Sequence, residues 1–155
     1  IHRSIFSEVY PWAGEIRKVD ICKGDTLFET HSKIATGLQA IFDDINKNLP
    51  KMSTQGFDEV STAIAKILGQ LNQIHPFREG NGRTQRVFIH NLLDHLGFEM
   101  DWTTVSSDAM TYACIEFKEG NINPMRKLIR LNLKVKENKV VHLSADDPVV
   151  RLFSG

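Results

Sequence analysis

The sequence has little of what several protein classes need. Only two of its 155 residues are cysteines, Cys22 and Cys114, which lie far apart and not in metal-ligand spacing. A disulfide framework needs paired cysteines, so we expect two reduced thiols in a cytosol-like compartment. No apolar run approaches the roughly 20 residues that span a bilayer, so we expect no membrane partner. Nineteen basic residues balance nineteen acidic ones, and no overall field favours nucleic acid.

Two common motifs for catalysis are also missing. There is no Gly-x-x-x-x-Gly-Lys-Ser/Thr loop of the P-loop proteins and no His-Glu-x-x-His zinc motif. The chain opens with "IHRSIFSEVY", without a methionine, and Ile1, Ile5 and Val9 have helical spacing. We therefore expect an amphipathic helix at the start and a missing segment upstream of it.

What remains is the pattern of a single all-α domain. Apolar stripes predict helices over residues 32–49, 57–71, about 82–96, 110–119 and from 123 onward. Pro50 is expected to end the first of these. The segment "RKVDICKGDTLFE" alternates instead, which predicts a short β-hairpin that turns at Lys23-Gly24-Asp25.

One short segment, "HPFREGNGRTQR", concentrates chemistry in twelve residues. Gly80, Asn81 and Gly82 precede a predicted helix, and such a turn can aim backbone N–H groups at an anion. Arg83 and Arg86 share one side of the first helical turn, where their guanidinium groups suit phosphate oxygens. The segment therefore predicts a phosphate-binding site.

The same segment carries an acid and a base. Glu79 beside an anion site is explained by Mg²⁺, which takes one or two protein carboxylates together with substrate phosphates. His75 has an ordinary pKa near 6.5 and can accept a proton at neutral pH. Phe77 lies between polar neighbours and is expected to point into the core as an anchor. Each residue alone is unremarkable in a surface loop, and it is their clustering that favours phosphoryl-type transfer to a hydroxyl.

These residues resemble the Fic family motif, His-x-Phe-x-Asp/Glu-Gly-Asn-Gly-Arg-x-x-Arg, at every defined position. The upstream "IFSEVYPWAGEIR" and the later "GNINPMRKLI" are similar to other segments of the family. The resemblance covers most of residues 1–133, which we predict to be the catalytic core. Residues 134–155 are predicted to be an extension that packs on the core or leads to a further domain.

The resemblance implies a protein adenylyltransferase with a Fic-type helical bundle, using ATP and Mg²⁺ to move AMP onto a hydroxyl of a target protein. His75 would be the base and Glu79 the Mg²⁺ ligand. The cradle for the α- and β-phosphates would be Gly80, Asn81 and Gly82. Arg83 would contact the β- and γ-phosphates and Arg86 the γ-phosphate.

The hairpin falls where the family has its flap, a segment that would pair with an extended stretch of the target. The predicted flap consists of Lys18, Val19, Asp20, Ile21, Cys22, Lys23, Gly24, Asp25, Thr26, Leu27 and Phe28. Family members are commonly inhibited by a helix with Ser/Thr-x-x-x-Glu-Gly/Asn, whose glutamate pairs with the second motif arginine. This sequence lacks that motif, so we expect the inhibitory helix on a separate antitoxin-type protein or in the missing N-terminal segment.

Two alternatives stay open. The first is transfer of another phosphate-containing group, such as UMP, phosphocholine or phosphate. The second is a catalytically idle module that only binds partners, although no motif residue is lost. A nucleic-acid partner is not expected, because basic and aromatic residues do not interleave. A cytoplasmic enzyme and a translocated effector both fit the sequence.

Overall fold

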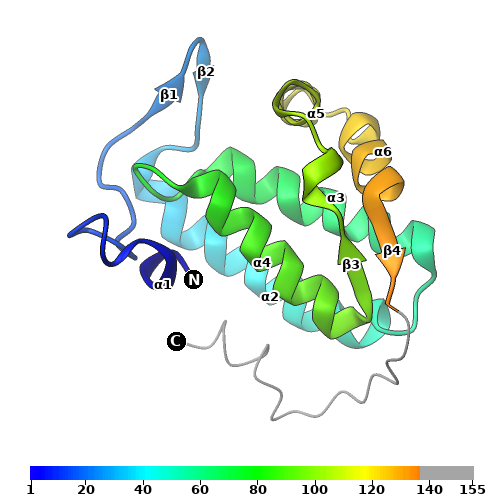
Figure 1. The fold of residues 1–155 in the computed structure, drawn as a ribbon. Coiled ribbons are helices and arrows are strands. Elements are labelled where there is room, and N and C mark those ends of the chain that lie inside the picture. The colour runs from blue at the N-terminus through cyan, green and yellow to red at the C-terminus, as the bar shows by residue number, and fades with distance from the viewer. Residues whose placement is uncertain (137–155) are drawn as a thin grey trace.

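The computed structural model describes residues 1–136, and this part is mostly helical (Figure 1). Its helices are α1 (His2–Phe6), α2 (Ile34–Met52), α3 (Phe57–Ile74), α4 (Asn81–Leu96), α5 (Ser107–Lys118) and α6 (Asn123–Asn132), with two short 3-10 turns, η1 (His31–Lys33) and η2 (Trp102–Thr104). Strands β1 (Cys22–Lys23) and β2 (Thr26–Leu27) form one antiparallel pair, and β3 (Phe98–Met100) and β4 (Leu133–Val135) form another. The predicted helical class with a hairpin flap is confirmed.

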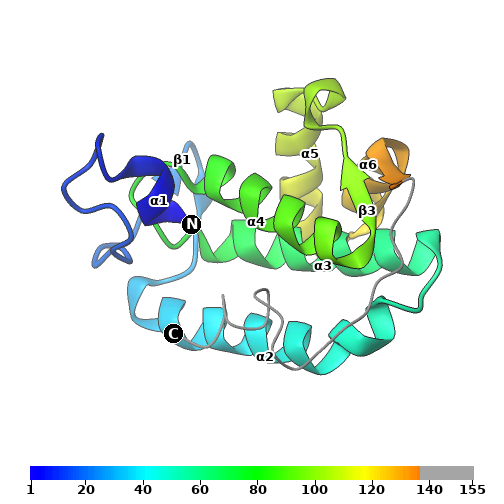
Figure 2. The same ribbon diagram turned by 60° about the horizontal axis from the view of Figure 1, so that its bottom comes forward.

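Helix α3 is the centre of the core. It packs against α2, α4, α5 and α6, and Figure 2 shows α2 along one side of it and α5 and α6 on the opposite side. Val60, Ile64 and Leu68 lie at helical spacing along α3 and are almost fully buried. Because α3 is held on several sides, its C-terminal end at Ile74 is a fixed platform for the residue that follows.

Helix α2 does not stop at Pro50 as the sequence predicted. It continues to Met52, and the Ser53 N–H donates to the Leu49 carbonyl to close the last turn. Proline removes one backbone donor there, but Leu49 and Met52 are both buried in the core. Burial of this last turn outweighs the one missing hydrogen bond.

The first helix was predicted with the wrong inward face. Helix α1 is only one turn long, and its buried residues are His2 and Phe6. Ile5 is partly exposed and Val9 is 64% exposed. His2 and Phe6 are four residues apart, so both rings lie on one face, where they contact each other with centroids 4.8 Å apart. A cluster of rings, not an aliphatic stripe, fixes the start of the chain.

The pair of β3 and β4 was not predicted. Phe98 aligns with Val135 and Met100 with Leu133, so the pair joins the end of α4 to the end of α6. Strand β4 thus crosses the predicted core boundary at residue 133, and residues 137–155 of the predicted extension lie outside the described residues. None of the helices within residues 1–136 is long and apolar enough to cross a membrane.

Candidate functional site

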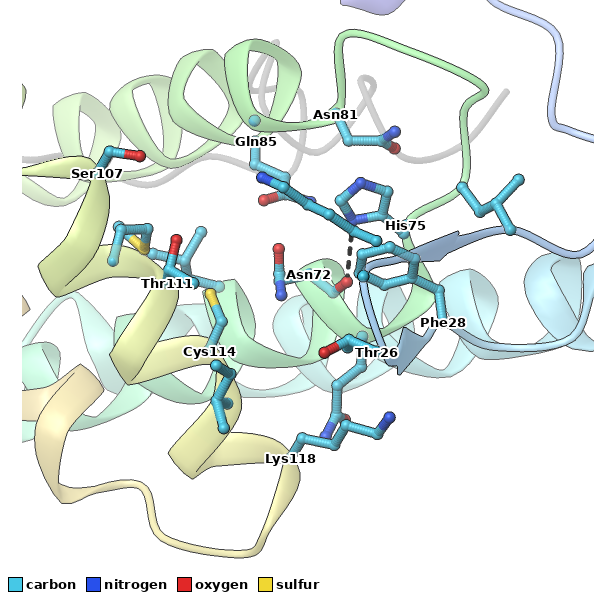
Figure 3. Close-up of a pocket in the computed structure, with 18 of the residues that line it drawn as sticks. Thr26, Phe28, Asn72, His75, Asn81, Gln85, Ser107, Thr111, Cys114 and Lys118 are labelled. Carbon is cyan, nitrogen blue, oxygen red and sulfur yellow. Dashed lines mark hydrogen bonds between the residues drawn. The ribbon is translucent and has the colours of Figure 1, made fainter.

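The predicted motif lies in the loop between α3 and α4 and opens onto a cavity of about 1310 Å³. The flap lies on one side of this cavity and α5 on the opposite side (Figure 3). The C-terminal end of α3 and the start of α4 line the space between them. Residues 72–86, the flap and α5 are far apart in the sequence but meet here. Most of the predicted site residues therefore lie around one cavity.

His75 ends α3 in an unusual backbone conformation. Its φ of 48° and ψ of 64° are left-handed, and it is the one non-glycine residue among residues 1–136 with a positive φ. Its N–H donates to the Leu71 carbonyl at 3.0 Å, which closes the helix. A side chain in this conformation is strained by roughly 1–3 kcal/mol, so the surrounding structure must hold it in place.

The imidazole of His75 is in the state that a general base needs. Its Nδ1 lies 3.2 Å from the Asn72 carbonyl oxygen (Figure 3). A carbonyl can only accept, so Nδ1 carries the proton and Nε2 keeps a free lone pair. The Phe28 ring stacks on the imidazole with centroids 3.8 Å apart. Burial lowers the pKa of His75 to about 4, in spite of the opposing effect of the bond to Asn72, so the ring is neutral near pH 7.

The start of α4 has unpaired backbone donors at the place where the anion cradle was predicted. Gly80 has a φ of 80°, and a Cβ there would lie 2.4 Å from Phe6, so only glycine fits. The first backbone bond of the helix runs from the Thr84 N–H to the Gly80 carbonyl at 3.0 Å, which leaves the N–H groups of residues 81–83 without a carbonyl within the helix. A Cβ at Gly82 would meet no atom within 4 Å. The helix therefore offers backbone donors to an open space that suits a phosphate.

The side chain of Asn81 holds the loop and does not face an anion. The side chain is buried, and its amide donates to the Phe77 carbonyl at 2.7 Å and accepts from the Phe77 N–H at 2.9 Å. Both polar ends of the amide are therefore occupied by the loop. Asn81 holds the loop shut with its side chain and can offer only its backbone N–H to an anion.

Phe77 anchors the loop, but not in the main core. The ring is half-buried and stacks on His2 with centroids 3.9 Å apart. His2 in turn donates from Nε2 to the Glu79 carbonyl at 3.0 Å and accepts from the Gly14 N–H at Nδ1. The expectation that Phe77 points into the core is thus only partly right, because the anchor is the aromatic cluster at the N-terminus.

Glu79 is exposed at the cavity and is the one motif carboxylate there. Its Oε1 accepts from the Gly80 N–H at 3.1 Å. Among residues 1–136 no three His, Cys, Asp or Glu side chains are grouped to hold a metal ion. Mg²⁺ needs only one or two protein carboxylates when substrate phosphates supply further oxygens. A single carboxylate beside a phosphate cradle fits that requirement.

The two motif arginines differ in whether they line the cavity. Arg86 lines the cavity, whereas Arg83 does not, and the guanidinium of Arg83 stands 4.5 Å from the centroid of the Phe6 ring. The charged side chains that line the cavity are Lys23, Arg78, Arg86 and Lys118, against the carboxylates Glu29 and Glu79. Four cations against two anions give the cavity a positive excess that the neutral composition of the whole chain does not show.

Only part of the predicted flap, residues 18–28, is paired as β-strand. Cys22 pairs with Leu27 and Lys23 with Thr26, so the turn is Gly24–Asp25, and Lys23 belongs to a strand instead of the turn. Gly24 has a φ of 58°, which favours glycine at this first turn position. On the cavity side, Lys118 of α5 donates from Nζ to the Leu27 carbonyl at 2.9 Å and ties the flap to the opposite wall.

Several residues of the site escaped prediction from the sequence. Asn72 contributes its carbonyl to His75, and every residue has a carbonyl, whereas His2 lies 77 residues before Glu79 in the loop that it supports. Arg17 is 2% exposed beneath the flap and touches the backbone of His75. Both Cys22 and Cys114 are free thiols, as predicted, and burial raises the pKa of Cys114 to about 11.

Comparisons with known protein sequences point to the same family as the motif. The sequence model of the Fic/DOC family matches residues 1–93. Among curated relatives, protein adenylyltransferase VbhT of Bartonella schoenbuchensis is 40% identical over 135 residues, which are 86% of this chain and 28% of VbhT. A Sinorhizobium fredii protein named "Probable protein adenylyltransferase y4lH" is 32% identical over 84% of this chain and 68% of its own length.

Solved structures of Fic domains also resemble this chain. The N-terminal Fic domain of a VirB-translocated Bep effector of Bartonella quintana, solved with bound ADP, matches with a TM-score of 0.80 at 26% identity, over 88% of this chain and 71% of that chain. BepC of Bartonella tribocorum, solved with bound AMPPNP, matches with a TM-score of 0.78 at 26% identity, over 88% and 72%. The motif, the fold and the family match agree, and the chain belongs to the Fic/DOC family.

Proposed function

We propose that residues 1–133 are the catalytic core of a protein adenylyltransferase, which moves AMP from ATP to a Ser, Thr or Tyr hydroxyl of a target protein. The observation that carries this proposal is the state of His75. Its Nε2 is unprotonated and stands in a cavity that Glu79, Gly82 and Arg86 also line. The names of the relatives, and the nucleotides in two related structures, support ATP as the donor.

In this mechanism the target hydroxyl gives its proton to Nε2 of His75 while its oxygen attacks the α-phosphorus of ATP. The new P–O bond forms as the bond to the β-phosphate bridging oxygen breaks, and pyrophosphate leaves with that electron pair. The Asn72 carbonyl keeps the proton of Nδ1 in place and stabilises the imidazolium that results.

The remaining motif residues position and neutralise the donor. The backbone N–H groups of Asn81 and Gly82 would bind the α- and β-phosphates and Arg86 the γ-phosphate, whereas the Gly80 N–H, also predicted for the cradle, already donates to Glu79. Arg83, whose guanidinium lies over the Phe6 ring, would contact the β- and γ-phosphates. Glu79 would hold Mg²⁺, which when bound neutralises charge on the phosphates and the leaving pyrophosphate.

The partners follow from the same site. The flap, residues 18–28, would pair with an extended target segment and bring its hydroxyl to His75. An inhibitory glutamate, supplied by an antitoxin-type protein or a segment upstream of Ile1, would pair with Arg86 and exclude the γ-phosphate. The target is a protein either of the same cell, for a cytoplasmic enzyme, or of a host cell, for a translocated effector.

The test is transfer of label from ATP labelled on the α-phosphate, with Mg²⁺, to proteins of a lysate. The chain is compared with His75→Ala and with His90→Ala, a control on the exposed side of α4. Label on protein with the wild type and His90→Ala, but not His75→Ala, is the expected result. ATP labelled on the γ-phosphate, UTP and CDP-choline are run in parallel, and label from one of these alone would refute AMP as the transferred group. ATP binding by all three proteins without any transfer would favour the binding module.

A further inference from the structure

Arg17 is a buried cation that lies behind the residues lining the cavity and is not itself one of them. Its side chain is 2% exposed, and it is absent from the cavity wall. All of its hydrogen bonds go to backbone carbonyls. Four hydrogen bonds engage most of the five N–H groups of this buried guanidinium, so its role lies in the fold and not in binding a ligand.

The acceptors come from two separate parts of the molecule. Nε donates to the His75 carbonyl at 2.8 Å, and one terminal nitrogen donates to the Ile74 carbonyl at 3.0 Å, both at the end of α3. The same terminal nitrogen also donates to the Glu29 carbonyl, and the other one donates to the Val19 carbonyl at 2.7 Å, so both ends of the flap are held. One planar group therefore bridges the flap and the strained residue that ends α3.

The position suits an arginine for electrostatic reasons. The nearest carboxylate is Asp20, whose oxygen is 3.9 Å away on a side chain that is 54% exposed. The closer partners are the last carbonyls of α3, where the helix dipole is negative. Burial lowers the pKa of Arg17, but an arginine stays charged through such a shift. A lysine would keep the charge but would lack the three nitrogens that reach both sides.

We propose that Arg17 is a positioning residue, which fixes the flap relative to His75 so that a hydroxyl docked on the flap meets the base. This inference rests on the proposed transferase function. The flap sets where the target lies, the left-handed backbone of His75 sets where Nε2 lies, and Arg17 is hydrogen-bonded to both. An error of about 1 Å in such an alignment can cost on the order of a hundredfold in rate.

The experiment compares wild type with Arg17→Lys and with Arg126→Lys, an exposed control of the same type on α6. In Arg17→Lys we expect kcat for transfer to fall by about tenfold or more, because alignment is lost, with ATP affinity by calorimetry within about twofold. Arg126→Lys should match the wild type in both. The ¹⁵N spectrum of the histidine rings, with His75 assigned by its absence in His75→Asn, is recorded on each chain without nucleotide. The Nδ1–H form of His75 should dominate in wild type and Arg126→Lys and become a mixture in Arg17→Lys.

The spectrum separates this inference from the proposed function, because it needs neither donor nor target. If wild type transfers nothing from ATP but the His75 signal still changes in Arg17→Lys, the function is wrong, and what stands is that Arg17 fixes the geometry of His75. An unchanged His75 signal together with an unchanged kcat would overturn the positioning role. A variant that fails to fold, or that loses ATP affinity in parallel with kcat, would show that Arg17 supports the whole fold and would equally overturn it.

Discussion

The titration of His75 is the sharpest quantitative consequence of the site. Burial beneath Phe28 lowers the pKa of this base to about 4, so the neutral and active form persists below pH 6.5. At about pH 5.5 a histidine with a pKa near 6.5 is only about 9% neutral, whereas one with a pKa near 4 is about 97% neutral. Acidification from about pH 7.5 to about pH 5.5 should therefore cost about tenfold of the neutral base if the pKa is ordinary, and almost nothing if it is shifted.

The direct assay is an NMR titration of ¹³C-labelled histidines in the chain without nucleotide. The His75 signal, assigned by its absence in His75→Asn, should not move between these two pH values. Phe28→Ala, which uncovers one face of the imidazole, should shift the midpoint upward towards 6.5. Phe28→Leu, which keeps an apolar cover, should shift it less. A wild-type midpoint at or above pH 6 would refute the argument that burial sets the state of the base.

Three further outcomes follow from the geometry. Gly80→Ala should lower the melting temperature, because the new methyl group meets the Phe6 ring at 2.4 Å and the left-handed backbone alone costs about 1–2 kcal/mol. Gly82→Ala should melt like wild type but bind ATP more weakly by calorimetry. Phe77→Ala should cost less than the roughly 3–5 kcal/mol of a fully buried ring, since Phe77 is half-buried, and urea unfolding would check this. Iodoacetamide at neutral pH should alkylate the exposed Cys22 faster than Cys114, whose pKa is raised by burial, as followed by mass spectrometry.

Sequence periodicity was enough to predict most of the helices, because their stripes are also the buried faces. The stripe through Val60, Ile64 and Leu68 is buried along α3 as predicted. Where the prediction failed, a tertiary contact outweighed a local rule. Burial of Met52 carries α2 past Pro50, and ring contacts of His2 outweigh the aliphatic spacing at the start of the chain.

The site was predicted as a set of residue types, but not as an arrangement. The motif indicated a base, a carboxylate and a cradle, and His75, Glu79 and Gly82 do line one cavity. That Arg83 lies over an aromatic ring, away from the cavity, depends on α1, which is distant in the sequence. Backbone acceptors such as the Asn72 carbonyl are likewise invisible in a sequence, because a carbonyl is common to every residue and only its direction matters.

The left-handed backbone at His75 sets stability against side-chain identity at one position. Glycine or asparagine would relieve the strain there, and the free energy released would be about 1–2 kcal/mol for glycine. The fold alone would therefore favour another residue, and the strain is the cost of holding an imidazole at the end of α3.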